Sequence, residues 1–288
     1  MNEENAKILI LEYFPAVVVK KITKIGEGLG NIAFEVNNDL IFRFPKNEKS
    51  KEQLGREIPS LKLINKHATL PVPDFIYIAP DNSLVGYKKL IGTALLYERS
   101  LYPNWQSFSR QIGRFLTAIH SIPYQELKTS HLLAKTSSVE ECLNEGHEFF
   151  EKVRRVIPHK YILLIESFFQ ARHPSVSIDS VLCHNDFGIE HILINNGKVS
   201  GIIDWSGAAI TDPAQDFGRL YRDLEVKLVD QILDEYSAST VKKNIIRERA
   251  IFYGKCLSFQ DIYYGLENQQ SEYSDKSLKS LEWMFPVL

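Results

Sequence analysis

The sequence is poor in cysteine, lacks a long apolar run and carries almost no net charge, and each shortage excludes a class of protein. Only three of its 288 residues are cysteines, and Cys142, Cys183 and Cys256 lie far apart. This odd, scattered set fits neither a disulfide framework nor a zinc site, and it favours thiols in a reducing compartment. No stretch is long enough to cross a bilayer, and the N-terminus lacks the basic start of a signal peptide. We therefore expect a cytoplasmic protein without a membrane partner.

The charge balance excludes a further kind of partner. The formal net charge of −2 leaves no global basic surface, so we expect no nucleic-acid partner. The apolar fraction of 44% and the charged fraction of 24% are ordinary for a globular protein. We find neither internal repeats nor low-complexity segments. A chain of this length can form two lobes around a shared cleft.

The most informative stretch runs from residue 181 to residue 217 and reads VLCHNDFGIEHILINNGKVSGIIDWSGAAITDPAQDF. An apolar strand that ends at Cys183 leads into a loop that contains Asp186, and four residues separate Asp186 from His191. A second apolar run then ends at Asp204. The stretch therefore puts an acidic residue and a histidine in one loop, and a second acidic residue at the tip of the next hairpin.

These residue types are the ones that phosphoryl transfer requires. The reaction needs a carboxylate that orients and deprotonates the acceptor hydroxyl, and ligands that hold Mg²⁺ across the phosphates of a nucleotide. Asp186 lies where such a base belongs, just after a strand. Asp204 is the stronger metal ligand because Mg²⁺ prefers oxygen, and His191 either binds the metal or positions a water. For any one of these residues alone, a capped loop or a solvated turn is an equally good interpretation.

The whole pattern, H-x-D-x(4)-H followed by Ile-Asp-Trp and then D-P-x-x-D-F, resembles the aminoglycoside phosphotransferase family, the antibiotic kinases with a protein-kinase-like fold. The segments HNDF and IDWSGAAITDPAQDF are most similar to its aminoglycoside 2''- and macrolide 2'-phosphotransferase branches. The resemblance spans the full chain and implies an α+β, bilobal fold. It implies a small β-rich N-lobe with one helix (1–91), a larger helical C-lobe (92–288) and a nucleotide in the cleft between them.

The resemblance also implies an activity. It implies an enzyme that transfers the γ-phosphoryl group of ATP or GTP, with Mg²⁺, to a hydroxyl of an aminoglycoside and so confers resistance. We expect a monomer. Asp186 becomes the base, and Asp204 with His191 holds the metal. His120 is expected to be structural, and Asp212 and Asp216 are expected to brace the catalytic loop rather than contact substrate.

On the donor side, a glycine loop precedes the central stretch. Gly28, Gly30, Asn31 and Ile32 lie in GEGLGNI between two expected strands. Glycine loops fold over phosphates because they let backbone N–H groups approach closely. On its own this pattern is equally typical of a plain hairpin turn. The family resemblance makes it the loop that flanks the nucleotide.

The next expected strand carries Arg43 where this family usually has a lysine. Arginine keeps the positive charge and can bind phosphate through two nitrogens. Glu57, on an expected helix over residues 49–66, is its natural ion-pair partner, although a lone helix glutamate is usually solvated. Lys46 is a second candidate for the phosphate contact. Pro59 predicts a kink or a break in this helix.

Residues 87–90 resemble the hinge that holds the purine base. We assign Tyr87 to the back of the base pocket and Lys88, Lys89 and Leu90 to the hinge itself. An edge strand that runs into a loop has the same pattern. The bulk of Tyr87 bears on the choice between ATP and GTP, and the sequence leaves that choice open.

The acceptor side is the least specific part of the sequence. We expect a helix over 218–236 with Asp223 and Glu225 facing the cleft, separate helices over 241–257 and 261–266, and Glu267 beside the acceptor. These are few carboxylates for a polycationic aminoglycoside, because such ligands are recognised by opposite charge. A macrolide or another small alcohol therefore stays open. A nucleotide-binding pseudokinase is the alternative from another class, supported by Arg43 alone.

Overall fold

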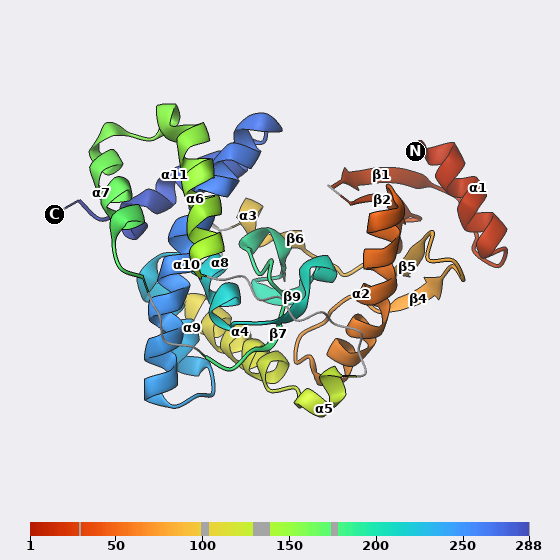
Figure 1. Cartoon of the computed structure of the whole chain (residues 1–288). Helices are drawn as coiled ribbons and strands as arrows, with labels where there is room; N and C mark the ends of the chain where they lie inside the picture. Colours follow the sequence, from red (N-terminus) through yellow and green to blue (C-terminus); the bar gives the residue numbers. More distant parts are fainter. Residues whose placement is uncertain (29, 99–103, 129–138, 174–177, 288) are drawn as a thin grey trace.

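The computed structural model describes residues 1–28, 30–98, 104–128, 139–173 and 178–287, so Leu29 of the glycine loop lies outside the described residues. The strands are β1 (Ile22–Glu27), β2 (Asn31–Val36), β3 (Leu40–Pro45), β4 (Phe75–Ile78), β5 (Val85–Lys88), β6 (Thr93–Ala94), β7 (Val181–Cys183), β8 (Ile192–Asn195), β9 (Lys198–Ile202) and β10 (Ala209–Thr211). The helices are α1 (Glu3–Tyr13), α2 (Glu48–His67), α3 (Leu95–Glu98), α4 (Trp105–His120), α5 (Tyr124–Leu127), α6 (Val139–Val153), α7 (His159–Gln170), α8 (Ala214–Asp223), α9 (Val226–Glu235), α10 (Thr240–Glu267) and α11 (Ser271–Met284). The five-stranded sheet lies with α1 and α2 on one side of the molecule, and helices α6 to α11 lie on the other (Figure 1).

The N-terminal part is an antiparallel five-stranded sheet in the order β1-β2-β3-β5-β4. Alternation along β3 gives the sheet two different faces. Phe42 and Phe44 lie on one face and join Phe34 in a core that packs against α1. Arg43, with Ile41 beside it on the strand, lies on the opposite face. The sheet therefore buries an aromatic face and turns a charged one toward the rest of the molecule.

Helix α2 runs unbroken through Pro59, so the expected break is absent. The Asn47 side chain caps its N-terminus by accepting the backbone N–H of Ser50 at 2.9 Å, which satisfies one of the end donors. Leu54, Glu57, Leu61 and Ile64 are among the residues that it buries. Burial on one side over five turns outweighs the hydrogen bond that proline removes.

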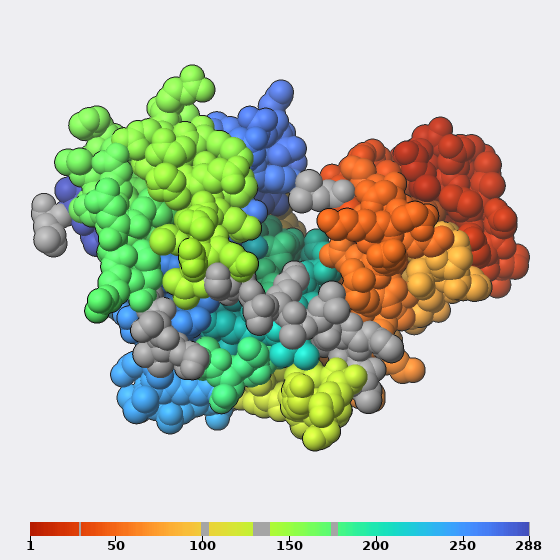
Figure 2. Space-filling view, viewed as in Figure 1, coloured from red at the N-terminus to blue at the C-terminus, as the bar shows by residue number. Residues whose placement is uncertain are grey.

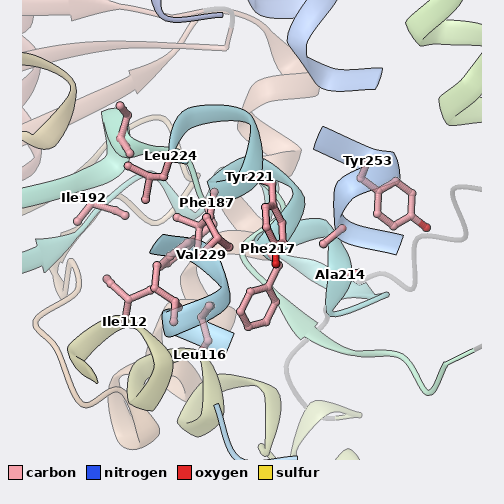
Figure 3. Close-up of a cluster of buried hydrophobic side chains, with 14 of the residues drawn as sticks. Ile112, Leu116, Phe187, Ile192, Ala214, Phe217, Tyr221, Leu224, Val229 and Tyr253 are labelled. Carbon is pink, nitrogen blue, oxygen red and sulfur yellow. The ribbon is translucent and has the colours of Figure 1, made fainter. Parts of the chain in front are cut away.

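The C-terminal part has the main hydrophobic core, in which helices α4, α8, α9 and α10 pack around the central loop (Figure 3). Phe187 of this loop is fully buried and stacks on Phe115 with ring centroids 5.9 Å apart. Two small sheets, β7–β10 and β6–β8–β9, carry the loop between them. The α+β fold with a β-rich N-terminal region and a helical C-terminal region is as the sequence predicts.

Two helix predictions are wrong in detail. The expected helix over 218–236 is two helices, α8 and α9, because Leu224 takes an extended conformation with φ −121° and ψ 155° between them. The two helices expected over 241–257 and 261–266 are one 28-residue helix, α10. No helix among the described residues is both long and apolar enough to span a membrane. A notch separates the surface of α2 from that of the C-terminal helices (Figure 2).

Candidate active site

A cavity of about 720 Å³ lies between the sheet and the helical part. Its wall includes residues from β1, β2, β3 and β5, from the central loop, and from helices α8, α10 and α11. Charged residues dominate the end near the loop, and they are Arg43, Asp186, Glu190, His191, Asp204, Arg219 and Asp261. The segments that the sequence singles out therefore meet in one cleft.

Asp186 lies in the loop after β7 and is held from three directions. Arg219 of α8 places one guanidinium nitrogen 2.9 Å from Asp186 Oδ1. The imidazole of His191 donates from Nδ1 to the carbonyl oxygen of Asp186 at 2.8 Å. The buried His184 accepts the Asp186 backbone N–H at 3.2 Å. About a third of the Asp186 side chain stays exposed, so the carboxylate is fixed in direction and open to the cavity.

His191 lies between the two aspartates. Its Nε2 is 3.7 Å from Asp204 Oδ2, and its Nδ1 is 3.7 Å from Asp186 Oδ2. Burial lowers the pKa of His191, but the carboxylates of Asp186, Asp204 and Glu190 outweigh burial and raise it. The histidine thus bridges the expected base and the expected metal ligand.

Asp204 follows β9 in a left-handed conformation, with φ 61° and ψ 69°. Ser206 donates its hydroxyl to Asp204 Oδ1 at 2.8 Å. Burial raises the pKa of Asp204, but His191 and Arg43 outweigh it and lower the pKa to about 2. A non-glycine residue in this region is uncommon and is found at functional sites. The carboxylate is therefore charged, and it lines the cavity.

The residues fit a magnesium ion through oxygen rather than nitrogen. Mg²⁺ is usually bound by one or two carboxylates, with water and substrate phosphates completing the shell. Asp204 meets this requirement. Ligand atoms of Asp186, Glu190 and His191 also lie within 4.8 Å of one another. His191 donates from Nδ1 to the Asp186 carbonyl oxygen, which leaves Nε2, 3.7 Å from Asp204 Oδ2, to face a metal or a water.

Arg43 of β3 and Glu57 of α2 form a buried, bidentate ion pair. The nitrogen–oxygen distances are 2.7 and 3.0 Å. Burial lowers the pKa of Arg43, but Glu57 and Asp204 outweigh burial and raise it. Arg43 also lines the cavity, so it presents a positive charge there. Lys46 is exposed and pairs with Glu27 at 2.9 Å.

The loop and hinge residues occupy the same wall. Gly28, Gly30 and Asn31 line the cavity, and Ile32 is buried behind them in the core of the sheet. The Asn31 side-chain oxygen is buried and has no hydrogen-bond partner within the described residues. A buried polar atom of this kind usually has a partner, so Asn31 is an unusual point in the wall of the cavity.

Tyr87, Lys89 and Leu90 also line the cavity, whereas Lys88 is exposed and does not. Burial raises the pKa of the Tyr87 phenol to about 12, so this side chain remains neutral. Lys89 forms an ion pair with Glu35. The lining of the cavity also includes the apolar residues Ile41 and Leu193.

Asp216 holds the catalytic loop, as the sequence predicts. Its two oxygens accept the backbone N–H groups of His184 and Asn185 at 2.9 and 2.8 Å, and the His120 ring nitrogen lies 3.1 Å away. All of these groups are buried or half-buried. Asp212 caps α8 through the Ala214 N–H at 2.8 Å. The structural role expected of His120 and the loop-bracing role expected of Asp216 are confirmed, whereas the Asp212 side chain contacts α8 and, through Arg249 at 2.6 Å, α10 rather than the loop.

The acceptor residues expected from the sequence do not lie where predicted. Asp223 is fully buried, where it pairs with Arg222 at 2.7 Å and accepts the Ile189 N–H at 3.0 Å. It therefore braces the loop and does not face the cleft. Glu225 and Glu267 are exposed and do not line the cavity. Glu225 lies in the turn between α8 and α9, and Glu267 is the last residue of α10, so both side chains point outward.

Other residues line this wall of the cavity, and the sequence analysis does not identify them. Glu190, Asp261 and Arg219 line the cavity together with Tyr264 and Tyr273. Glu190 lies between Asp186 and His191, and this position within the motif is the sequence signal that could have identified it. Asp261 lies one turn before Tyr264 on α10, a helix that the sequence analysis predicts as two separate helices.

Comparisons with known proteins place this constellation in context. The sequence model of the phosphotransferase enzyme family matches residues 21–249. The uncharacterized protein YcbJ of Bacillus subtilis is 26% identical over 194 residues, which are 62% of this chain and 60% of that protein. An aminoglycoside 3'-phosphotransferase of Escherichia coli is 31% identical over 121 residues, 40% of this chain and 42% of that protein. The matches span less than two thirds of the length of these relatives.

Solved structures resemble the chain over its whole length. The GDP complex of wild-type aminoglycoside 2'-phosphotransferase-IIIa is 23% identical, with a TM-score of 0.79 and coverage of 99% of this chain and 98% of that chain. A macrolide 2'-phosphotransferase from Brachybacterium faecium is 16% identical, with a TM-score of 0.67 and coverage of 99% of both chains. At these identities the likeness shows a common fold.

Proposed function

The chain belongs to the phosphotransferase enzyme family, and from that premise we propose that it transfers the γ-phosphoryl group of a nucleoside triphosphate to a hydroxyl of a small molecule. One observation carries the proposal. His191 lies within 3.7 Å of both Asp186 and Asp204 in a cleft whose opposite wall presents Arg43. This arrangement supplies a base, a metal ligand and a phosphate-binding cation around one space, which phosphoryl transfer requires.

In the proposed reaction Asp186 orients the acceptor hydroxyl and takes its proton. The hydroxyl oxygen forms a bond to the γ-phosphorus while the bond from that phosphorus to the β–γ bridging oxygen breaks. The products are a phosphate monoester and a nucleoside diphosphate. Arg219 holds one oxygen of the Asp186 carboxylate, and His191 holds the backbone carbonyl of the same residue. Such positioning contributes much of the rate enhancement in this kind of reaction.

For the donor we propose ATP or GTP with Mg²⁺. Asp204 would hold the metal, which would neutralise charge on the phosphates. Gly28, Gly30 and Asn31 would cover the phosphates from the N-lobe, and the segment 87–90 would meet the purine base. The structures of similar proteins include a GDP complex and an ADP-bound form, and this supports a nucleotide donor. In this proposal residues 1–91 form the nucleotide-binding lobe, and residues 92–288 carry the catalytic loop and the acceptor site.

For the acceptor we propose an antibiotic of the aminoglycoside class, which the names of several relatives and neighbours support, with antibiotic resistance as the outcome. A macrolide is the second candidate, because the aromatic side chains of Tyr264 and Tyr273 line this end of the cavity. We further propose a cytoplasmic monomer. The Arg43 substitution favours a pseudokinase, and the presence of both Asp186 and Asp204 argues against it.

The test is nucleotide turnover with Mg²⁺ in a coupled assay. Kanamycin, gentamicin and erythromycin serve as separate acceptors, each with ATP and with GTP. We expect turnover that depends on one acceptor class and on one preferred donor, and no such turnover from the Asp186→Asn protein. Nucleotide binding without stimulation by any acceptor would contradict the antibiotic assignment and favour the non-catalytic alternative. Size-exclusion chromatography of the same sample tests the monomer.

A further inference from the structure

Helix α2 makes contacts with both of the groups that the proposed function puts around the triphosphate. Its Glu57 holds Arg43 of β3 through two hydrogen bonds of 2.7 and 3.0 Å. One turn earlier, the side-chain amide of Gln53 donates from Nε2 to the carbonyl oxygen of Ser206 at 2.7 Å. Ser206 lies two residues after Asp204. One helix therefore reaches the phosphate-binding cation and the segment that carries the metal ligand.

The Gln53 contact continues to Asp204 through Ser206. The Ser206 hydroxyl donates to Asp204 Oδ1 at 2.8 Å, so the residue that accepts the Gln53 hydrogen bond also holds the metal-binding carboxylate. Asp204 has a left-handed backbone, a conformation that a non-glycine residue keeps only where surrounding contacts impose it. The short helical turn Trp205–Gly207 follows directly. The position of the Asp204 carboxylate therefore depends on what holds this turn.

Two other contacts hold the turn from the helical part of the molecule. The Asn185 side chain donates to the carbonyl oxygen of Gly207 at 3.1 Å. The indole of Trp205 is buried, and it donates to a carbonyl oxygen of β9 at 3.1 Å. These contacts fix the turn within its own lobe, whereas the Gln53 hydrogen bond fixes it relative to α2 and the sheet.

The spacing of the two α2 contacts suits a bridge across the cleft. Gln53 and Glu57 are four residues apart on an unbroken helix, so their side chains share one face and lie about 6 Å apart along the axis. The cavity lining includes Gln53, Arg43, Asp204 and Ser206. A triphosphate that carries the metal must contact Arg43 and Asp204 at the same time. A rigid helical turn between the two contacts sets the separation of these groups.

We propose that Gln53 is a positioning residue for the metal site. By holding Ser206, Gln53 keeps the Asp204 carboxylate at the separation from Arg43 that a metal-bound triphosphate fits. The proposal rests on the proposed function and deepens it, because it gives α2 a part in metal binding as well as in phosphate binding. It applies to ATP and GTP alike and does not depend on the acceptor.

The test is calorimetric binding of the non-hydrolysable imido analogues of ATP and GTP to the full chain, with Mg²⁺ and with a chelator. The quantity compared is the metal enhancement, which is the Kd with chelator divided by the Kd with Mg²⁺. The Gln53→Leu change removes the donor and keeps much of the side-chain volume. We expect it to lower the metal enhancement roughly three- to tenfold, as the loss of one hydrogen bond does. The Kd with chelator should stay within about twofold of the wild-type value.

Two further variants and a matched control locate the effect. Ser206→Ala removes the hydroxyl that holds Asp204; it should lower the metal enhancement by a similar factor, and it decides if the Gln53→Leu protein does not fold. In the Asp204→Asn protein, Gln53→Leu should cause no further decrease, because the metal ligand is already lost. The matched control is Glu52→Leu, which changes an exposed neighbour on the same helix and should leave the metal enhancement unchanged.

The wild-type metal enhancement in a folded Gln53→Leu protein, or in the Ser206→Ala protein in its place, overturns the inference. An equal loss of affinity with Mg²⁺ and with chelator also overturns it, since that result indicates a merely structural contact, and so does a further decrease in the Asp204→Asn background. Wild-type protein that binds neither analogue, or binds both independently of Mg²⁺, overturns it as well. Turnover reports separately: acceptor-dependent turnover with an unchanged enhancement in Gln53→Leu refutes the inference and leaves phosphotransfer standing. A lowered enhancement without turnover of any acceptor refutes phosphotransfer alone.

Discussion

The carboxylate of Asp186 owes its direction to neighbours that come from two segments. Arg219 of α8 approaches one oxygen, and His191 of the same loop is tied to the Asp186 backbone. These contacts use only part of the side chain, since about a third of it remains exposed to the cleft. A base that is fixed yet accessible can meet a hydroxyl without first reorganising.

The Asp186→Asn protein should therefore lose activity without losing its fold. We expect kcat to fall by a factor of roughly 10² to 10⁴, which is typical when a general base is removed. The melting temperature should stay close to that of the wild type, because the amide can keep the contact with Arg219. Steady-state kinetics with the best acceptor and a thermal melt measure the two quantities. Turnover within a few-fold of the wild type would show that another group takes the proton.

For single residues, the sequence predicts which side chains form an ion pair better than it predicts which way a side chain points. The ion pair of Arg43 with Glu57 follows from an inward-facing charge on a strand and a glutamate on the next helix. The direction of Asp223 does not follow, because it depends on Lys276 and on the packing of α11 against α8. Side chains whose partners come from distant elements cannot be oriented by periodicity alone.

Among the elements, α8 has the largest influence on the site. Its first turn carries Asp216, whose oxygens accept two backbone N–H groups of the catalytic loop, and its second turn carries Arg219. Burial raises the pKa of Asp216, but the hydrogen bonds and charge of His120 outweigh it and lower the pKa. The charged form is therefore the one that fixes the loop to the helix.

The Asp216→Asn change should destabilise the protein by about 2 kcal/mol at neutral pH, since hydrogen bonds to a charged group contribute roughly that much. The folded-state pKa is below the unfolded value, so the stabilisation is present above pH of about 4 and is lost as the pH falls through the folded value. Urea unfolding at pH 7 and at pH 3.5 measures the difference between wild type and variant. It should shrink at the lower pH.

The control for this change is Asp275→Asn, which removes an exposed carboxylate on α11 and should alter stability by no more than about 0.5 kcal/mol. An equal loss from both variants, or a loss from Asp216→Asn that does not depend on pH, would contradict the role assigned to the charged carboxylate.

Element boundaries separate what local sequence can predict from what it cannot. The apolar positions Leu220, Leu224, Leu228 and Ile232 fit one helical face, but the chain turns at Leu224 and begins again as α9. Conversely, α10 continues through Ser258 because its buried face is packed along its length against α6, α8 and α11. Both outcomes are set by tertiary packing, which helix propensity does not contain.

For the whole molecule, the important feature is that neither part contains a complete site. Arg43 and the glycine loop belong to the sheet, while Asp186 and Asp204 belong to the helical part. A hydrogen bond connects the two parts near Asp204: the Gln53 side chain of α2 donates to the carbonyl oxygen of Ser206 at 2.7 Å. A ligand that contacts both parts should therefore stabilise the protein as a unit.

We expect ATP or GTP with Mg²⁺ to raise the melting temperature. At a nucleotide concentration of about 100 times Kd, binding adds roughly 2.7 kcal/mol, which corresponds to about 5 °C for a chain of this size. Removal of the metal with a chelator, or the Asp204→Asn change, should abolish most of this shift because the phosphates would lose their link to the helical part. Differential scanning fluorimetry with and without chelator measures the shift in melting temperature.

The control is Asp74→Asn, which removes an exposed carboxylate that does not line the cavity and should leave the shift intact. A nucleotide shift that persists with chelator and in the Asp204→Asn protein would contradict the metal assignment, and the absence of any shift would contradict the donor site.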